Sequence, residues 1–224
     1  MNIKLVSLLT LTLSFCFSVL SQNLNKSQKL VSPVSEKFST QNNTQVDEMG
    51  NVRAIWNIGY GPVHGSSSEI AKLFLNRQSQ KFRMKDDLSD LEEKTVQKSP
   101  AGTHVRFVQK VGNVPVYNSD VVISISQNNI VTFVVNNYKP GLTSVDTTPK
   151  LSSNQALIKA EAQLGVTGKL FSQPSSTLII YPTGNNVRLA YRVVISSSEP
   201  RGDWEVFVDA HTGAIISAKD LTLF

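Results

Sequence analysis

The feature that most constrains the fold is an alternation of apolar and polar residues between Thr103 and Tyr138. It runs through the stretches THVRFVQKV, VPVYNSDVVISIS and NIVTFVVNNY, with breaks at Gly112-Asn113 and at residues 127–129. A period of two places alternate side chains on opposite faces of a strand, and Gly and Asn are typical of hairpin turns. The pattern, rich in β-branched residues, predicts an antiparallel meander with one covered face.

Two segments outside the meander have helical signals. Ser66 with Glu69, and Ser152 with Gln155, each form the capping-box pattern that begins a helix, and Gly165 is placed to end the second helix. Apolar residues follow each box at helical spacing: Ile70, Leu73 and Phe74 in the first helix, and Ala156, Ala160 and Leu164 in the second.

Further strands are predicted on both sides of the meander. NVRAIWNI precedes the first helix, with Val52, Ala54 and Trp56 expected on one side. TLIIYP, VRLAYRVVI, WEVFVD and AIISA follow the second helix. Their shared faces are expected to hold Leu189, Tyr191, Val193 and Ile195, and then Trp204, Val206 and Val208. Helix followed by antiparallel strands predicts an α+β fold.

The N-terminus has the order of a secretory signal peptide. Lys4 precedes an apolar run from Leu5 to Leu20, and cleavage is expected after Ser21. A retained membrane anchor is the alternative, although the run is short for a span. Cys16 is the single cysteine and lies in this segment, so the mature protein should have no disulfide, thiol nucleophile or thiolate metal site.

Residues 22–49, rich in Ser, Asn, Gln and Lys, have no periodicity and are interpreted as a flexible leader. A second polar stretch, MKDDLSDLEEKTVQKS, carries clustered acids but no Gly at the sharp turn that a calcium loop needs. It is interpreted as a solvated charged segment. Its acids are Asp86, Asp87, Asp90, Glu92 and Glu93.

No catalytic constellation is found in the sequence. His64, His104 and His211 lack the one-turn spacing of a zincin helix, and no Gly-x-Ser-x-Gly elbow is present. The formal charge of +5 is spread along the chain, without the basic stripe and interleaved aromatics of a nucleic-acid site. These residues favour a secreted protein that acts by binding, with no nucleic-acid partner.

Two stretches resemble a known family. AGTHVRFVQKVGNVPVYNSDVVISISQNNIVTFVVNNY resembles the propeptide motif (FTP) of secreted fungalysin- and thermolysin-class zinc metallopeptidases. LAYRVVISSSEPRGDWEVFVDAHTGAIIS resembles the PepSY unit that follows in those propeptides. The second stretch is the more specific, because Trp204, Asp209, Ala210, Thr212 and Gly213 stand in matching order. The likeness covers roughly residues 51–220.

The resemblance implies two small units, each a helix packed on antiparallel strands, the second cystatin-like. The expected organisation is a signal peptide at 1–21, a leader at 22–49, an FTP-like strand-helix unit at 50–98, a meander completing it at 99–145, and a PepSY-like domain with a C-terminal tail at 146–224.

In such zymogens the propeptide precedes the catalytic domain, helps it to fold, holds it inactive and is cut away. The resemblance therefore implies an intramolecular chaperone and inhibitor of a secreted zinc metallopeptidase, acting in cis or in trans. The chain stops at Phe224, where the linker into the enzyme would begin, so we expect no peptidase activity of its own. No cofactor is expected here, since zinc would belong to the partner.

The expected contact with the partner is the extended segment ISAKDLTLF and the sheet near Trp204, because peptide-binding clefts accept added strands. The expected partner-binding residues are Trp204, Asp220, Leu221 and Phe224. Two alternatives remain open. Trp204 could be a core residue. The chain could also be a free-standing secreted or periplasmic binding module with no peptidase partner and no stable membrane insertion.

Overall fold

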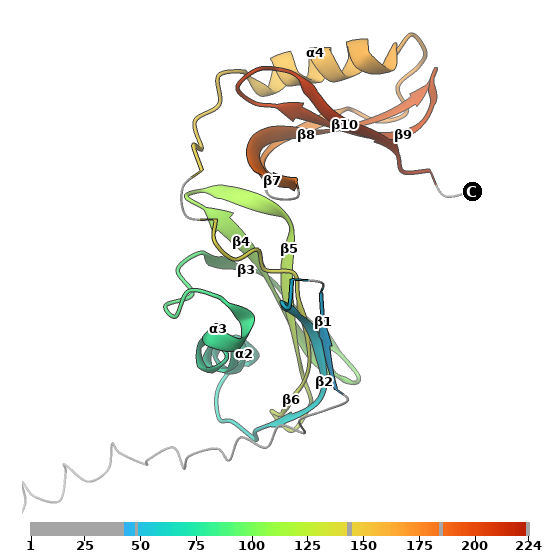
Figure 1. Cartoon of the computed structure of the whole chain (residues 1–224). Helices are drawn as coiled ribbons and strands as arrows, with labels where there is room; N and C mark the ends of the chain where they lie inside the picture. The colour runs from blue at the N-terminus through green and yellow to red at the C-terminus, as the bar shows by residue number, and fades with distance from the viewer. Residues whose placement is uncertain (1–42, 48, 143–144, 184–185, 223–224) are drawn as a thin grey trace, which may run out of the picture. The chain divides into compact units, whose positions relative to one another are not determined.

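The computed structural model describes residues 43–47, 49–142, 145–183 and 186–222, all within one compact unit, Glu36–Phe224 (Figure 1). The expected signal peptide, most of the expected leader, and Phe224 lie outside the described residues. The fold is mixed α/β with mostly strands and few helices, in agreement with the α+β prediction. No helix in the described ranges is long and apolar enough to cross a membrane.

The first half of the described chain is an antiparallel sheet with helix α2 packed against it. Its strands lie in the order β1-β2-β6-β5-β4-β3, and α2 contacts β4, β5 and β6 (Figure 1). The elements are β1 Thr44–Val46, β2 Val52–Tyr60, α2 Ser67–Arg77, α3 Ser79–Phe82, β3 Leu91–Ser99, β4 Gly102–Val111, β5 Val114–Ile125 and β6 Val131–Asn136. The predicted meander is thus confirmed as β4, β5 and β6.

The second half is one helix lying along an antiparallel sheet, in the order β7-β8-β9-β10 (Figure 1). The elements are α4 Ser153–Leu164, β7 Ser175–Thr183, β8 Asn186–Ser198, β9 Arg201–Asp209 and β10 Ile215–Asp220. A single parallel bridge, Val116 with Ile180, links β5 to β7, and Val114 and Val116 pack into the core beneath α4. Because β5 contributes to both halves, a division into two separate units stays a prediction.

Both predicted capping boxes are present. In α2 the Glu69 amide donates to Ser66 Oγ (3.3 Å), and the Ser66 amide donates to Glu69 Oε2 (2.8 Å). Ser152 and Gln155 repeat the arrangement at α4. Gly165 ends α4 with a φ of +67°, a left-handed conformation that glycine adopts without a Cβ penalty.

The predicted shared faces are correct for the C-terminal strands and wrong for β2. The expected faces of β8 and β9 point into the core beneath α4. In β2, however, Val52 is buried with Ile55, Ile58 and Tyr60, whereas Trp56, expected on the side of Val52, is exposed. The pairing with β1 shifts register between Val52 and Ala54, and the pairing with β6 shifts between Trp56 and Tyr60, where Asn57 has a φ of +54°. These irregularities move side chains to the other face, which strict alternation could not reveal.

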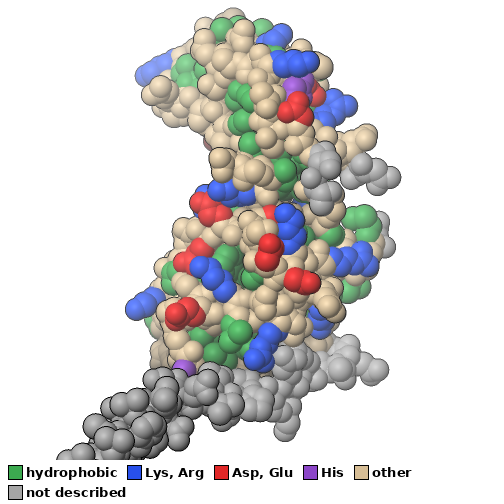
Figure 2. Space-filling view, turned by 90° about the vertical axis from the view of Figure 1, so that its left-hand side faces the viewer, with side chains coloured by type: hydrophobic (Ala, Val, Ile, Leu, Met, Phe, Trp, Pro, Cys, Tyr) green, Lys and Arg blue, Asp and Glu red, His purple; other side chains and the backbone are tan. Residues whose placement is uncertain are grey.

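The interpretation of residues 22–49 as a leader without structure is wrong at its end, because β1 pairs with β2 there. The acidic segment is also only partly solvated. Half of its charged residues lie on β3, where Lys72–Glu93 (3.3 Å) and Lys110–Glu92 (2.8 Å) form ion pairs. Acidic and basic side chains are interspersed on the face seen in Figure 2. Lone surface ion pairs of this kind add little stability.

Asp90 is the exception in that segment, because it is buried. Its Oδ2 accepts hydrogen bonds from the Tyr138 hydroxyl (2.7 Å) and from Gln109 Nε2 (3.3 Å). Burial is the largest cause, and the hydrogen bond and charge of Asp90 are smaller ones, that together raise the pKa of Tyr138 well above its usual value. The hydrogen-bond partners of Asp90 lie far along the chain, so the charge pattern around Asp90 wrongly predicted that its side chain is solvated.

We expect Tyr138→Phe to lower the free energy of unfolding by about 1–2 kcal/mol, because it leaves a buried carboxylate short of a donor. Urea denaturation measures the change. Tyr181→Phe is the matched control, since the Tyr181 hydroxyl makes no hydrogen bond within the described residues, and it should be close to neutral. Equal effects of the two variants would contradict the assigned role of the Asp90 contact.

Candidate functional site

The sheet β7–β10 has one face covered by α4 and one that is only partly covered. On the second face, Ile179, Ala190 and Phe207 form a small buried cluster with Tyr117 and Tyr181 packed against it. Phe207 stacks on Tyr181 with ring centroids 4.2 Å apart and meets Tyr117 edge-on at 4.9 Å. This part of the face is therefore already used for internal packing.

Further along the same face, two apolar side chains are exposed. The Phe171 amide donates to the Ser196 carbonyl (2.9 Å), Ser196 pairs with Asp203, and the Leu221 amide donates to the Asp203 carbonyl (2.6 Å). Residues opposite one another on neighbouring strands share a face, so Phe171 and Leu221 flank Ser196 and Asp203 in one row. Phe171 is 60% exposed and Leu221 43% exposed. We call this row the Phe171–Leu221 surface.

A cavity of about 340 Å³ lies at this surface. Its volume falls within the range of side-chain and small-ligand pockets. The residues that line it are Phe171, Ser196, Arg201, Gly202, Asp203 and Thr222. The surface therefore offers an exposed aromatic ring beside a hollow with hydroxyl and charged groups, a combination suited to binding a protein segment.

The chain on both sides of Leu221, at Asp220 and Thr222, is fixed by local hydrogen bonds. Asp220 Oδ1 accepts hydrogen bonds from the Thr222 amide (2.9 Å) and the Thr222 hydroxyl (2.6 Å), and Thr222 Oγ1 accepts one from the Asp203 amide (3.1 Å). These two hydrogen bonds from Thr222, of which the hydroxyl has the larger effect and the amide the smaller, hold the pKa of Asp220 below its usual value. Gly202, at a φ of +156°, allows this approach, since a Cβ there would lie 3.0 Å from both Asp220 carboxylate oxygens.

Among the expected partner-binding residues that the structure describes, only Leu221 belongs to the Phe171–Leu221 surface, because Asp220 is opposite Trp204 and so lies on the other face of the sheet. Trp204 pairs with Ile195 and packs against the core beneath α4, with its indole N–H donating to the Pro200 carbonyl (3.3 Å). These contacts fit the alternative that Trp204 is a core residue. Most of the expected tail is strand β10, and only Leu221 and Thr222 follow it in the described residues.

Phe171 was missed by sequence reasoning. It lies in the segment between α4 and β7, which has no periodicity to mark a face. An aromatic residue in a polar connector is the one signal that could have indicated it. Its proximity to Leu221 depends on pairing between segments distant in sequence.

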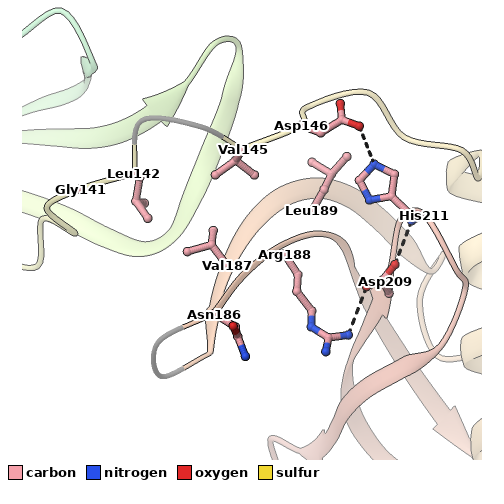
Figure 3. Close-up of a pocket in the computed structure, with 10 residues that line it drawn as sticks. All are labelled: Gly141, Leu142, Val145, Asp146, Asn186, Val187, Arg188, Leu189, Asp209 and His211. Atoms are coloured by element: carbon pink, nitrogen blue, oxygen red, sulfur yellow. Dashed lines mark hydrogen bonds and ion pairs between the residues drawn. The ribbon is translucent and has the colours of Figure 1, made fainter.

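A second cavity, of about 470 Å³, lies where Gly141, Leu142, Val145 and Asp146 meet β8 and the β9–β10 turn (Figure 3). Its charged groups are paired. His211 Nε2 lies 3.3 Å from Asp146 Oδ2, and Arg188 Nη1 lies 3.3 Å from Asp209 Oδ2. The Thr148 amide, with a smaller effect of His211, holds the pKa of Asp146 below its usual value. The arrangement fastens the segment before α4 to the sheet.

The described residues that line this second cavity include no hydroxyl or thiol side chain to act as a nucleophile. Their candidate bases are already paired, because His211 contacts the Asp146 carboxylate and the Thr148 carbonyl (3.0 Å from Nε2), and Asp209 faces Arg188. Within the described ranges, no three His, Cys, Asp or Glu side chains are grouped so that they could hold a metal ion.

Comparison with protein families gives two matches. Residues 89–138 match the Fungalysin/Thermolysin Propeptide Motif, and residues 150–219 match the Peptidase propeptide and YPEB domain, or PepSY. The PepSY match contains the expected residue Trp204 and all of strand β10 except Asp220. The domain boundaries expected at residues 50, 99 and 146 stay predictions.

Comparison with individual proteins finds protease sequences. Neutral protease B of Bacillus subtilis (strain 168) is 28% identical over 65% of this chain and 28% of its own length. Bacillolysin of Brevibacillus brevis is 23% identical over 84% of this chain and 37% of its own length. Bacillolysin of Bacillus amyloliquefaciens is 31% identical over 66% of this chain and 29% of its own length. The chain thus spans well under half the length of these relatives.

Among solved structures, the chain is similar to the Bacillus megaterium YpeB C-terminal domain, with a TM-score of 0.40, 14% identity, and coverage of 92% of this chain and 97% of that one. The chain therefore contains the FTP and PepSY propeptide domains and is homologous to the bacillolysin and neutral protease sequences of the thermolysin family.

Proposed function

We propose that the chain is a propeptide-type binding protein. It docks on the catalytic domain of a secreted thermolysin-class zinc metallopeptidase, assists its folding and covers its cleft. The observation that carries the proposal is the Phe171–Leu221 surface, an exposed aromatic and aliphatic pair beside a hollow. Phe171 lies within the segment that matches a peptidase propeptide domain, and Leu221 lies two residues beyond its end.

The physical chemistry supports a docking role. Removing apolar surface from water contributes roughly 25 cal/mol per Å², so a contact that buries the Phe171 ring and the Leu221 side chain contributes substantially to affinity. A ligand that binds only the native enzyme also stabilises it by mass action, which explains how one surface can serve both folding and inhibition. Phe224 completes the proposed contact set, and Trp204 and Asp220, which are paired on the side of α4, support the contact from the other face of the sheet.

In this proposal the chain is not itself an enzyme. Its sequence contains no HExxH motif, and the zinc belongs to the partner peptidase. The chain acts outside the cell, either as the N-terminal part of a zymogen or as a separate chain in trans. In this proposal each half of the chain is a unit in which a helix packs on a sheet, and the second unit is cystatin-like. The face of the β7–β10 sheet opposite α4 is turned to the enzyme.

Mixing the purified protein with a mature thermolysin-class peptidase should abolish proteolysis at a stoichiometric ratio, as judged by residual activity on a peptide substrate. We expect the double variant Phe171→Ser, Leu221→Ser to raise the inhibition constant at least about 10-fold, because it removes the exposed apolar contacts. The matched control is Ile158→Ser, which changes a 56% exposed apolar residue on α4 and should inhibit like the parent.

Two results would contradict the proposal. A titration that leaves activity unchanged, with the added protein neither binding nor being cleaved, would assign the chain to the alternative, a free-standing secreted binding module. Equal inhibition by the parent and the double variant would remove the Phe171–Leu221 surface from the contact.

A further inference from the structure

Strand β10 forms one edge of the C-terminal sheet, because it pairs only with β9 in the described residues. The Leu221 amide donates to the Asp203 carbonyl, which makes Leu221–Asp203 a hydrogen-bonded pair. In antiparallel sheets such pairs alternate with non-hydrogen-bonded ones. Lys219–Glu205 is then hydrogen-bonded, and Ala218 and Asp220 each direct an N–H and a C=O away from β9.

The two other end strands of the ten-stranded sheet, β1 and β3, are less suited to accept a strand. β1 has 3 residues and shifts register between Gln45 and Val46. β3 shifts register between Glu93 and Thr95, and its charges are typical of edges that resist pairing. These charged residues of β3 are Glu92, Glu93, Lys94 and Lys98.

The pairing of β10 with β9 is regular over the residues whose outward backbone groups have no strand partner in the described chain. Its own register shift lies between Ile215 and Ser217, before the two residues with outward backbone groups. Ala218 has a small side chain that does not block an added strand. The Asp220 carboxylate accepts hydrogen bonds from Thr222, so its charge does not extend beyond the edge where it would repel a partner strand. Lys219 is the one remaining charge, and it lies on the same face as Leu221.

We propose that the open edge of β10 pairs with an extended segment of the peptidase, which adds a strand to the sheet through the backbone of Ala218 and Asp220. This rests on the proposed function and specifies its mode of contact. The added strand continues the Phe171–Leu221 surface, because Leu221 directly follows β10. The chemistry of that face calls for an apolar residue beside Leu221 and an acidic residue beside Lys219.

The test is a substitution that removes one outward N–H and leaves the pairing with β9 intact. Ala218→Pro does this, since proline is tolerated on edge strands where its missing N–H faces outward. We expect Ala218→Pro to raise the inhibition constant for a thermolysin-class peptidase about 10-fold with an unchanged thermal midpoint. Ala218→Ser keeps the N–H and is the matched control, expected to inhibit like the parent protein.

Hydrogen exchange of the unmodified protein gives a second readout that does not depend on how the proline variant folds. The amides of Ala218 and Asp220 should exchange at least about 10-fold more slowly in the complex than in the free protein. If Ala218→Pro inhibits like the parent protein and the amides of Ala218 and Asp220 stay unprotected in the complex, strand addition is wrong, but the proposed function still stands. Protection that instead rises with the concentration of the protein by itself would assign the edge to a second copy of this chain, and would also overturn the proposal. If the parent protein neither binds nor inhibits, the proposed function fails and this inference with it.

Discussion

Replacing Phe74 by Ala should lower the free energy of unfolding by about 3–5 kcal/mol, the largest stability effect expected for a single change in this protein. Phe74 lies on the inward side of α2 and is fully buried. Its ring meets Tyr60 edge-on with centroids 5.3 Å apart and contacts Phe82 at 6.3 Å. The substitution removes the aromatic surface and leaves a cavity that β2 and α3 cannot close without moving.

Urea denaturation followed by far-ultraviolet circular dichroism measures this effect. Phe74→Leu keeps most of the apolar volume and should cost less than half as much as Phe74→Ala. Leu73→Ala is the positional control, because Leu73 is the neighbouring residue on α2 and is only partly buried. A loss below about 1 kcal/mol for Phe74→Ala would show that α2 is not anchored by this cluster.

Asp209→Ala should have the second largest effect, a loss of about 2–3 kcal/mol, because several donors converge on one buried carboxylate. Asp209 Oδ1 accepts hydrogen bonds from the amides of His211 (3.0 Å) and Thr212 (2.9 Å) in the β9–β10 turn, and Oδ2 faces Arg188. Removing the carboxylate leaves both amides unpaired and releases the turn that positions β10. Thermal and urea unfolding measure the loss.

The same carboxylate predicts a pH dependence. Burial raises the pKa of Asp209, but the amides of Thr212 and His211, together with the Thr212 side chain and Arg188, outweigh it and hold that pKa below its usual value. A carboxyl whose pKa is lower in the folded state contributes stability that is complete above the unfolded pKa of about 3.9. That contribution is lost as the pH falls through the lower pKa of the folded state.

Asp209→Asn separates the charge from the shape of the side chain. Its free energy of unfolding should fall less steeply than that of the parent protein as the pH is lowered from about 5 to 2. Above pH 5 the variant should be the less stable of the two. Parallel curves for parent and variant would mean that Asp209 has the same pKa in the folded and unfolded states.

The sequence determined those parts of the protein that depend on neighbouring residues. The capping boxes at Ser66 and Ser152 were predicted because each is closed by a residue three positions later. The strands of the meander, and the inward faces of β8 and β9, followed from regular alternation over their length. The resemblance to the PepSY unit was likewise drawn from residues close together in the sequence, Trp204 to Gly213, which lie within the matched range.

The tertiary structure decided everything that depends on contacts between distant residues. The pairing with β6 set which side chains of β2 are buried, and the irregularity at Asn57 could not be read from alternation. Asp90 is buried because its partner Tyr138 lies 48 residues away. The Phe171–Leu221 surface exists because the Phe171 segment, β8, β9 and the chain after β10 are joined by hydrogen bonds across the sheet. Local sequence fixes dihedral preferences and caps, whereas these surfaces arise from long-range burial and strand register, which no single segment encodes.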